Sequence, residues 1–298
     1  MAIEDDFFVT NLELRESTDT GEGAAGLSHA SMKGMVLLTV RELAARGEPQ
    51  AVVTVVHDAG DTGERYGALA TDLAERGFAV ALPDLRGHGR TEGERGHSNG
   101  LLEVERDIQE IQDHLAYMMP EGPKVLIGIG LGANYAVTFA ARNPGALAAL
   151  VLLAPLFEPG FVEPEAPGGL KKFFKKLTPL SPGTTGYEPD ALTSAAGQAT
   201  AWSANERTHD VITLRASEEA RRSAREDLPR VGELGIPVLV LHGDDDPITP
   251  ASRSTALAGG TVDVETFEGR HHLLHDKRSA EVRARIVEWL GQRIGKAD

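Results

Sequence analysis

The chain has 298 residues and a formal charge of −15, with 45 acidic and 30 basic side chains. A negative charge of this size repels polyanions at long range, so nucleic acid and anionic membranes are disfavoured as partners. The chain contains no cysteine, which excludes disulfides, thiolate metal sites and a cysteine nucleophile. Its length suits one large core, and α/β folds of this size commonly form a single domain with an insertion.

The N-terminal third predicts two antiparallel strands followed by a βαβ unit. Residues 7–14 and 35–43 alternate between apolar and polar side chains, and a Gly-rich and Ser-rich loop is expected between them over 18–31. A β-branched run over 51–56 is followed by helical spacing and by a further strand over 78–82. The acidic first residues differ from the basic start of a secretory signal, so we expect a cytoplasmic protein.

The middle of the chain continues the alternation of strands and helices. Apolar residues at helical spacing over 104–118 precede a strand over 125–127, a glycine-rich turn, a second helix and a strand over 147–153. The longest apolar run, residues 146–154, is too short to cross a bilayer, so stable membrane insertion is not expected. Strands that alternate with helices predict a mostly parallel sheet.

This rhythm breaks over residues 157–230, which are rich in proline and glycine and predict an inserted cap. The cap contains KKFFKK at 171–176, whose phenylalanines are expected to pack on the pocket; the alternative is a helix that touches lipid headgroups. The parallel pattern resumes with strands over 236–241 and 262–267 and ends in an amphipathic helix over 282–294. We therefore expect one α/β domain over residues 1–298 with the cap inserted in it.

Five segments carry a resemblance to a known family. They are HDAGDTGERY (57–66), PDLRGHGRTEGERG (83–96), the glycines of GIGLG (128–132), HGDDDP (242–247) and EGRHH (268–272). Over residues 35–290 the chain resembles the monoacylglycerol lipase and lysophospholipase branch of the α/β-hydrolases, the serine aminopeptidase S33 type. The resemblance implies the α/β-hydrolase fold, with helices on both sides of a mostly parallel sheet, and lipase or esterase ancestry. The order of the last three segments also matches this fold.

The resemblance assigns roles to particular residues. Asp246 occupies the position of the triad acid, and His272 occupies the position of the triad base, three residues after a glycine; the neighbouring His271 fits that spacing less well. The oxyanion donors would be the backbone N–H groups of Ala59 and Leu131. In a triad the acid orients the imidazole and stabilises its protonated form. A His272–Asp246 pair would therefore retain acid–base capacity, unless the pair serves only to hold the loops together.

The chain departs from the family pattern at three positions. Gly130 stands in place of the nucleophilic serine at the elbow, the turn formed by residues 128–132. Ile129 stands in place of the histidine that usually precedes the serine, and Asp58 in place of a glycine in the loop after the third strand. Three departures together favour natural divergence over a deliberate serine replacement. Loss of a triad nucleophile costs on the order of a millionfold in turnover, so ordinary acyl-enzyme hydrolysis is not expected.

Three functions remain open. The favoured one is non-covalent chemistry on a small apolar or aromatic substrate with a His272–Asp246 base, as in a lyase, isomerase, cyclase or cofactor-free oxygenase. The alternatives are an inactive pseudohydrolase that binds a small apolar or lipid-like ligand, and a hydrolase with a relocated nucleophile. Asp58 is either an acid, base or binding group in the pocket or a solvated loop residue. No cofactor is expected and, because no metal-ligand spacing is present, no metal; the oligomeric state is left open.

Overall fold

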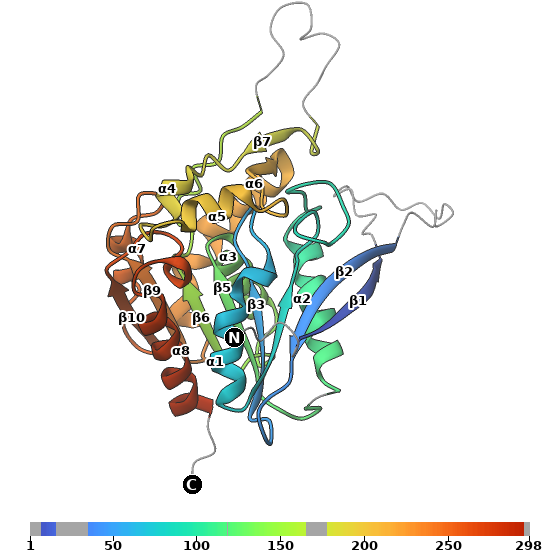
Figure 1. Ribbon diagram of the computed structural model, residues 1–298, viewed down its shortest axis with the longest axis vertical. Helices are drawn as coiled ribbons and strands as arrows, with labels where there is room; N and C mark the ends of the chain where they lie inside the picture. The colour runs from blue at the N-terminus through green and yellow to red at the C-terminus, as the bar shows by residue number, and fades with distance from the viewer. Residues whose placement is uncertain (1–6, 16–34, 118, 165–177, 295–298) are drawn as a thin grey trace, which may run out of the picture.

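An eight-stranded sheet forms the centre of the computed structural model, which describes residues 7–15, 35–117, 119–164 and 178–294 (Figure 1). In spatial order its strands are β1 (Phe8–Arg15), β2 (Met35–Leu43), β4 (Phe78–Pro83), β3 (Ala51–Val56), β5 (Lys124–Ile129), β6 (Ala149–Leu153), β9 (Val238–Gly243) and β10 (Val262–Phe267). The pairs from β4 to β10 are parallel, whereas β1 and β2 join antiparallel. The predicted, mostly parallel α/β sheet is confirmed.

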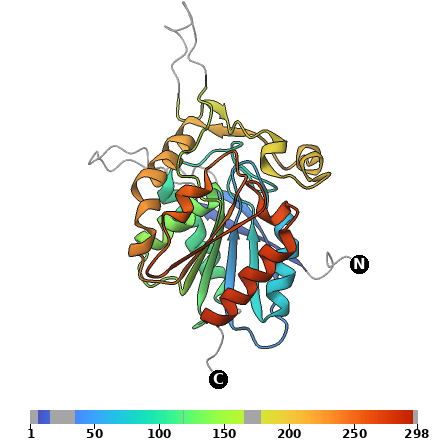
Figure 2. The ribbon, with the colours of Figure 1, turned by 90° about the vertical axis from the view of Figure 1, so that its left-hand side faces the viewer.

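Helices cover both faces of this sheet and explain why the central strands are apolar on both sides. On one face lie α1 (Gly67–Glu75) and α8 (Ser279–Ile294), which contact each other and are seen together in Figure 2. On the other face lie α2 (Leu101–Leu115) and α3 (Leu131–Arg142). Residues of β3 are buried throughout, as expected for a strand that has helices above and below it. None of the described helices is long and apolar enough to span a membrane.

The segment between β6 and β9 carries several short elements, and its residues 157–230 are here called the insert. The elements are α4 (Pro189–Leu192), α5 (Gln198–Ala204), α6 (Leu214–Glu226), the 3₁₀ turn η4 (Leu228–Glu233), and the antiparallel strands β7 (Pro182–Thr184) and β8 (Val211–Thr213). In Figure 1 the helices α4, α5 and α6 lie over one end of the sheet. The division into one domain with an inserted cap stays a prediction. The predicted loop over 18–31 and the basic cluster over 171–176 lie outside the described residues.

The insert is hydrogen-bonded to the loops that follow β3 and β4. The His209 backbone N–H donates to the Gly60 carbonyl at 2.9 Å, and the His209 Nε2 lies 3.1 Å from the Gly87 carbonyl oxygen. The fit is close: Gly60 has φ +71, and a Cβ there would lie 1.8 Å from the His209 carbonyl oxygen. Only glycine allows the insert to approach this loop so closely.

His209 is expected to make stability depend on pH. Burial, followed by the positive charge of Arg95, lowers the pKa of His209 to about 4, and the His88 ring lies 4.7 Å away. Because the unfolded pKa is about 6.5, the folded state prefers the neutral ring, and this stabilisation is complete above about pH 6.5 and lost as the pH falls through about 4. In urea unfolding at pH values across this window, His209→Gln should lose less free energy of unfolding than the unmodified chain. Parallel pH profiles would contradict this assignment.

Candidate functional site

The elbow between β5 and α3 is shaped by glycines. Gly130 has φ +53 and ψ −115, a conformation that is strained for any residue with a side chain. A Cβ on Gly128 would come within 2.5 Å of the backbone of α3, and one on Gly132 within 2.2 Å of the carbonyl oxygen of Val56 in β3. The glycines at 128 and 132 therefore let the strand and helix crowd together, and position 130 is aimed at the site.

The carboxylate of Asp58 fills the space in front of Gly130. A Cβ on Gly130 would lie 2.1 Å from the Asp58 Oδ1 and 2.5 Å from its Oδ2. The Asp58 side chain belongs to the loop after β3 and is only 1% exposed. The alternative of a solvated loop aspartate is therefore wrong, and the carboxylate instead occupies the space that a side chain at position 130 would need.

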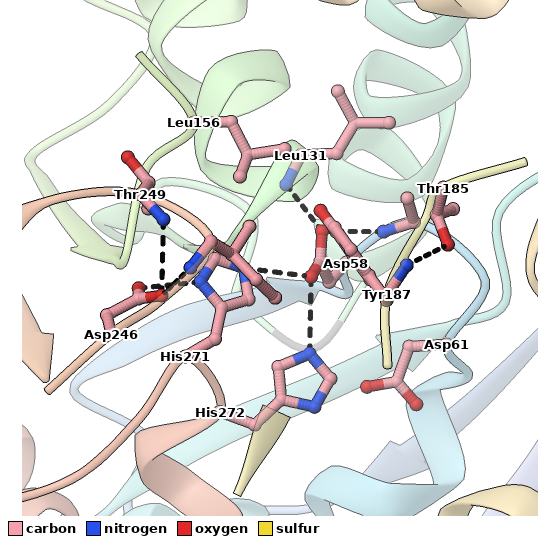
Figure 3. A network of polar contacts seen from close by, with 12 residues as sticks. Asp58, Asp61, Leu131, Leu156, Thr185, Tyr187, Asp246, Thr249, His271 and His272 are labelled. Atoms are coloured by element: carbon pink, nitrogen blue, oxygen red, sulfur yellow. Dashed lines mark hydrogen bonds and ion pairs between the residues drawn. The ribbon is translucent and has the colours of Figure 1, made fainter. Parts of the chain in front are cut away.

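The Asp58 carboxylate also uses both predicted oxyanion donors. Its Oδ1 accepts hydrogen bonds from the backbone N–H groups of Ala59 and Leu131, each at 2.7 Å (Figure 3). Two converging N–H groups form an anion-binding site for a substrate oxygen in acyl transfer. Here that site is filled by the protein's own carboxylate.

The predicted pair of His272 with Asp246 is not formed; His271 takes that place. The His271 Nδ1 lies 2.7 Å from the Asp246 Oδ2, and the His271 Nε2 lies 3.2 Å from the Asp58 Oδ2. His272 stands directly before the 3₁₀ turn η5 (Leu273–His275), and its backbone N–H donates to the Leu192 carbonyl of the insert at 2.7 Å. This turn directs the His272 ring to Asp58 instead, with its Nε2 3.2 Å from Oδ2.

Asp246 is held rigidly by groups that sequence reasoning missed. Its Oδ1 accepts from the backbone N–H groups of Ile248 and Thr249, at 2.8 and 3.2 Å. The His242 Nε2 lies 3.1 Å from its Oδ2, and the His242 Nδ1 lies 2.7 Å from the Ser254 hydroxyl. The HGDDDP segment contains His242, but the sequence alone does not reveal that its ring turns towards the aspartate four residues later.

The electrostatics of the site follow from burial and pairing. Burial raises the pKa of Asp58, but the close contacts and positive charge of His271 and His272 outweigh it and hold that pKa well below its usual range. The pKa of Asp246 is lowered in the same way by His271 and His242. Burial lowers the pKa of His271, and the two carboxylates overcome this and raise it to about 10. The His271 ring therefore lies between two carboxylates that favour its protonated form.

A mainly apolar pocket adjoins the oxyanion donors. Ala59 and Leu131 line it together with Leu85, Tyr135, Ile212 and Ala216. Polar groups stand at its edge, including Ser98 and the buried ion pair of Arg86 with Asp107. The wall is mainly apolar, but the cavity has a volume of about 20 Å³, the room of about one water molecule, so an apolar or aromatic ligand would enter only if the wall moved.

Among the described residues, one cluster has the composition of a metal site. The donor atoms of Asp58, His271 and His272 all lie within 4.8 Å of one another. Sequence spacing did not indicate this cluster, because His272 is 214 positions from Asp58, and the aspartate and the two adjacent histidines lie on separate loops.

Comparisons with known proteins agree with the fold. The chain matches the family model described as serine aminopeptidase, S33, over residues 47–278. The monoacylglycerol lipase of Mycolicibacterium smegmatis is 26% identical over 249 residues, which cover 82% of this chain and 89% of that protein. The monoglyceride lipase of Homo sapiens is 27% identical over 277 residues, which cover 84% and 86% of the two chains.

A solved structure also resembles the whole arrangement. The crystal structure of Paleococcus ferrophilus monoacylglycerol lipase superposes with a TM-score of 0.70 at 24% identity, covering 86% of this chain and 99% of that one. At this identity the likeness shows the fold alone. The family match spans most of the chain and includes the loops that carry Asp58, Gly130, Asp246 and His271. The chain therefore belongs to the serine aminopeptidase S33 family of α/β-hydrolases.

Proposed function

We propose that this chain does not hydrolyse esters through an acyl-enzyme, although it belongs to a hydrolase family. The observation that carries the proposal is the position of the Asp58 carboxylate, which fills the space in front of Gly130 and binds both oxyanion donors. Gly130 stands where the resembled hydrolases carry the nucleophilic serine and supplies no hydroxyl. Loss of one oxyanion donor alone costs roughly 10² to 10³ in kcat, and here both are occupied.

The chemistry best supported is proton transfer to or from a small apolar or aromatic substrate, without a covalent intermediate. His271 takes the role first assigned to His272, because Asp246 orients its ring as a triad acid orients the catalytic imidazole. A positioned acid or base contributes roughly 10² to 10⁴ in rate and needs no serine. Lyase, isomerase, cyclase and cofactor-free oxygenase reactions all fit this description. The charge of −15 supports the absence of a nucleic-acid partner, and a cytoplasmic location without stable membrane insertion is part of the proposal.

A second candidate function is binding without catalysis. It is favoured by the burial of the polar groups: Asp58, His271 and His272 are at most 2% exposed and contact one another. In that case the apolar pocket would hold a small ligand that leaves unchanged. The third alternative is a relocated nucleophile, and its candidate is Ser98, a serine that lines the described pocket. No described imidazole is hydrogen-bonded to the Ser98 hydroxyl, so this alternative is the weakest.

The test is to identify the ligand and then follow its fate. Native mass spectrometry of copurified material, with thermal-shift screening of apolar and aromatic compounds, supplies the ligand. We expect turnover to fall by roughly 10² or more in His271→Gln, the loss of a positioned acid or base. The matched control is His275→Gln, because His275 is half-buried with a buried Nε2 but lies outside the Asp58–His271–Asp246 chain. A ligand that is bound and never altered would establish the binding function instead.

A further inference from the structure

We propose that Asp58, His271 and His272 form a binding site for one divalent transition-metal ion. The inference deepens the proposed function, because it gives the same atoms a metal partner, and it rests on Asp58 staying in the site. It replaces the sequence-based expectation of no metal.

The two separations between the carboxylate oxygen and the imidazole nitrogens match those of coordinated ligands. The Asp58 Oδ2 lies 3.2 Å from the Nε2 of His271 and 3.2 Å from the Nε2 of His272. Metal bonds of about 2.0 to 2.2 Å place neighbouring ligands roughly 3.0 Å apart at a right angle and roughly 3.4 Å apart at a tetrahedral angle. Both contacts fall between these values, and all three donor atoms lie within 4.8 Å of one another.

Surrounding groups hold two of these ligands in the orientation that a metal requires. Asp246 contacts the His271 Nδ1 at 2.7 Å and thereby leaves its Nε2 to face the cluster. This carboxylate–imidazole contact is the usual support of a metal-bound histidine. The Asp58 Oδ1 accepts hydrogen bonds from the N–H groups of Ala59 and Leu131, which leaves Oδ2 to face the two imidazoles.

A buried nitrogen in the cluster lacks a partner. The His271 side chain is fully buried, yet its Nε2 has no hydrogen bond in the described structure, because its 3.2 Å contact with Asp58 lacks hydrogen-bond geometry. The His272 Nδ1, on the far side of its ring, is also unpartnered. Buried polar atoms are nearly always paired, and a bound ion is one of the explanations for an exception. An ion between the two rings and Asp58 would give the His271 Nε2 its partner.

The donor set selects the class of ion. Two imidazoles and one carboxylate suit Zn²⁺, Fe²⁺, Co²⁺ or Ni²⁺, whereas Mg²⁺ and Ca²⁺ prefer oxygen ligands. Three protein ligands leave at least one position for water or a substrate oxygen. The Tyr187 ring centre lies 5.7 Å from that of His271. The Tyr187 hydroxyl is buried and has no hydrogen-bond partner in the described structure.

The experiment measures metal binding in the absence of substrate. Tag-free chain is stripped with a chelator, loaded with Zn²⁺ or Co²⁺, desalted and analysed for bound metal, with Co²⁺ followed by its visible absorption. Because the ligands are buried, a second sample is refolded from urea with Zn²⁺ present. We expect about one equivalent of metal and an increase in Tm, as binding to the folded state alone requires.

Variants separate this site from adventitious binding on the surface. Asp58→Asn keeps an oxygen for the two backbone N–H groups but loses the carboxylate, and His272→Gln removes one imidazole while His271 stays in place. Both should bind metal weaker by at least roughly tenfold, whereas His275→Gln should bind as the unmodified chain does. Equal uptake by all four proteins, or no uptake by either loading route, would overturn the metal site. No uptake would still leave metal-free proton transfer standing, and uptake without turnover would leave the metal site standing.

Discussion

The double variant Asp58→Gly with Gly130→Ser is expected to gain esterase activity, whereas Gly130→Ser alone is expected to stay inactive. The single serine would place its Cβ 2.1 Å from the Asp58 Oδ1, so it has no room beside the aspartate. Removal of Asp58 frees the N–H groups of Ala59 and Leu131 for a substrate carbonyl. His271 is then left near the new hydroxyl, since its Nε2 is 3.2 Å from the oxygen that Asp58 places there.

The expected gain is large because a complete triad exceeds a site without its nucleophile by about 10⁶ in turnover. We expect the double variant to hydrolyse a p-nitrophenyl ester at least roughly 10³ times faster than either single variant. This gain is smaller than the full factor of about 10⁶ in turnover. It should also form a covalent adduct with a fluorophosphonate probe, seen by intact mass spectrometry, whereas the unmodified chain and Asp58→Gly should not.

Three results would contradict this prediction. Activity of Gly130→Ser equal to that of the double variant would show that Asp58 leaves the site readily. A folded double variant without activity would show that His271 is not positioned as a base. Labelling of the unmodified chain that disappears in Ser98→Ala would instead reveal a relocated nucleophile.

His271→Ala is expected to lower the free energy of unfolding more than His275→Ala does. His271→Ala leaves Asp58 and Asp246 as buried carboxylates without the ring that lies between them. Breaking a buried ion pair from one side costs about 3 to 5 kcal/mol in free energy of unfolding. Urea unfolding followed by circular dichroism, in the presence of a chelator, measures this loss.

The matched control is His275→Ala. His275 is half-buried, its ring centre lies 5.2 Å from that of Tyr66, and its buried Nε2 has no hydrogen-bond partner in the described structure. Its loss is expected to lie in the ordinary range for core truncations, about 0.5 to 3 kcal/mol. Equal losses in the two variants would show that the carboxylates relax or take up protons without the His271 ring.

Local signals in the sequence were sufficient for the sheet and the elbow. The strand over 262–267 has the predicted bounds, because its period-two pattern lies between clear turn residues. The elbow was predicted from its glycines, since a turn this tight depends on residues next to one another. The resemblance named the N–H groups of Ala59 and Leu131 as oxyanion donors; both point to one atom, the Asp58 Oδ1, and their role towards a substrate stays a prediction.

The side-chain arrangement of the site depends on contacts between distant segments, which spacing alone does not reveal. His271 and His272 are adjacent, and what separates their roles is η5 together with a hydrogen bond to Leu192 in the insert. Asp58 turns inward because Gly130, 72 positions later, has no side chain to oppose it. The cluster of Asp58, His271 and His272 was missed for the same reason, because its aspartate and its histidines are more than 200 positions apart.

The close approach of Asp58 to Gly130 also restricts how such a site can change during evolution. Serine at position 130 and aspartate at position 58 compete for one space, so a sequence that carries both must move the Asp58 carboxylate out of its present place. An intermediate with small residues at both positions avoids this clash. Return of the serine in one step, with Asp58 present, would separate the carboxylate from the N–H groups of Ala59 and Leu131.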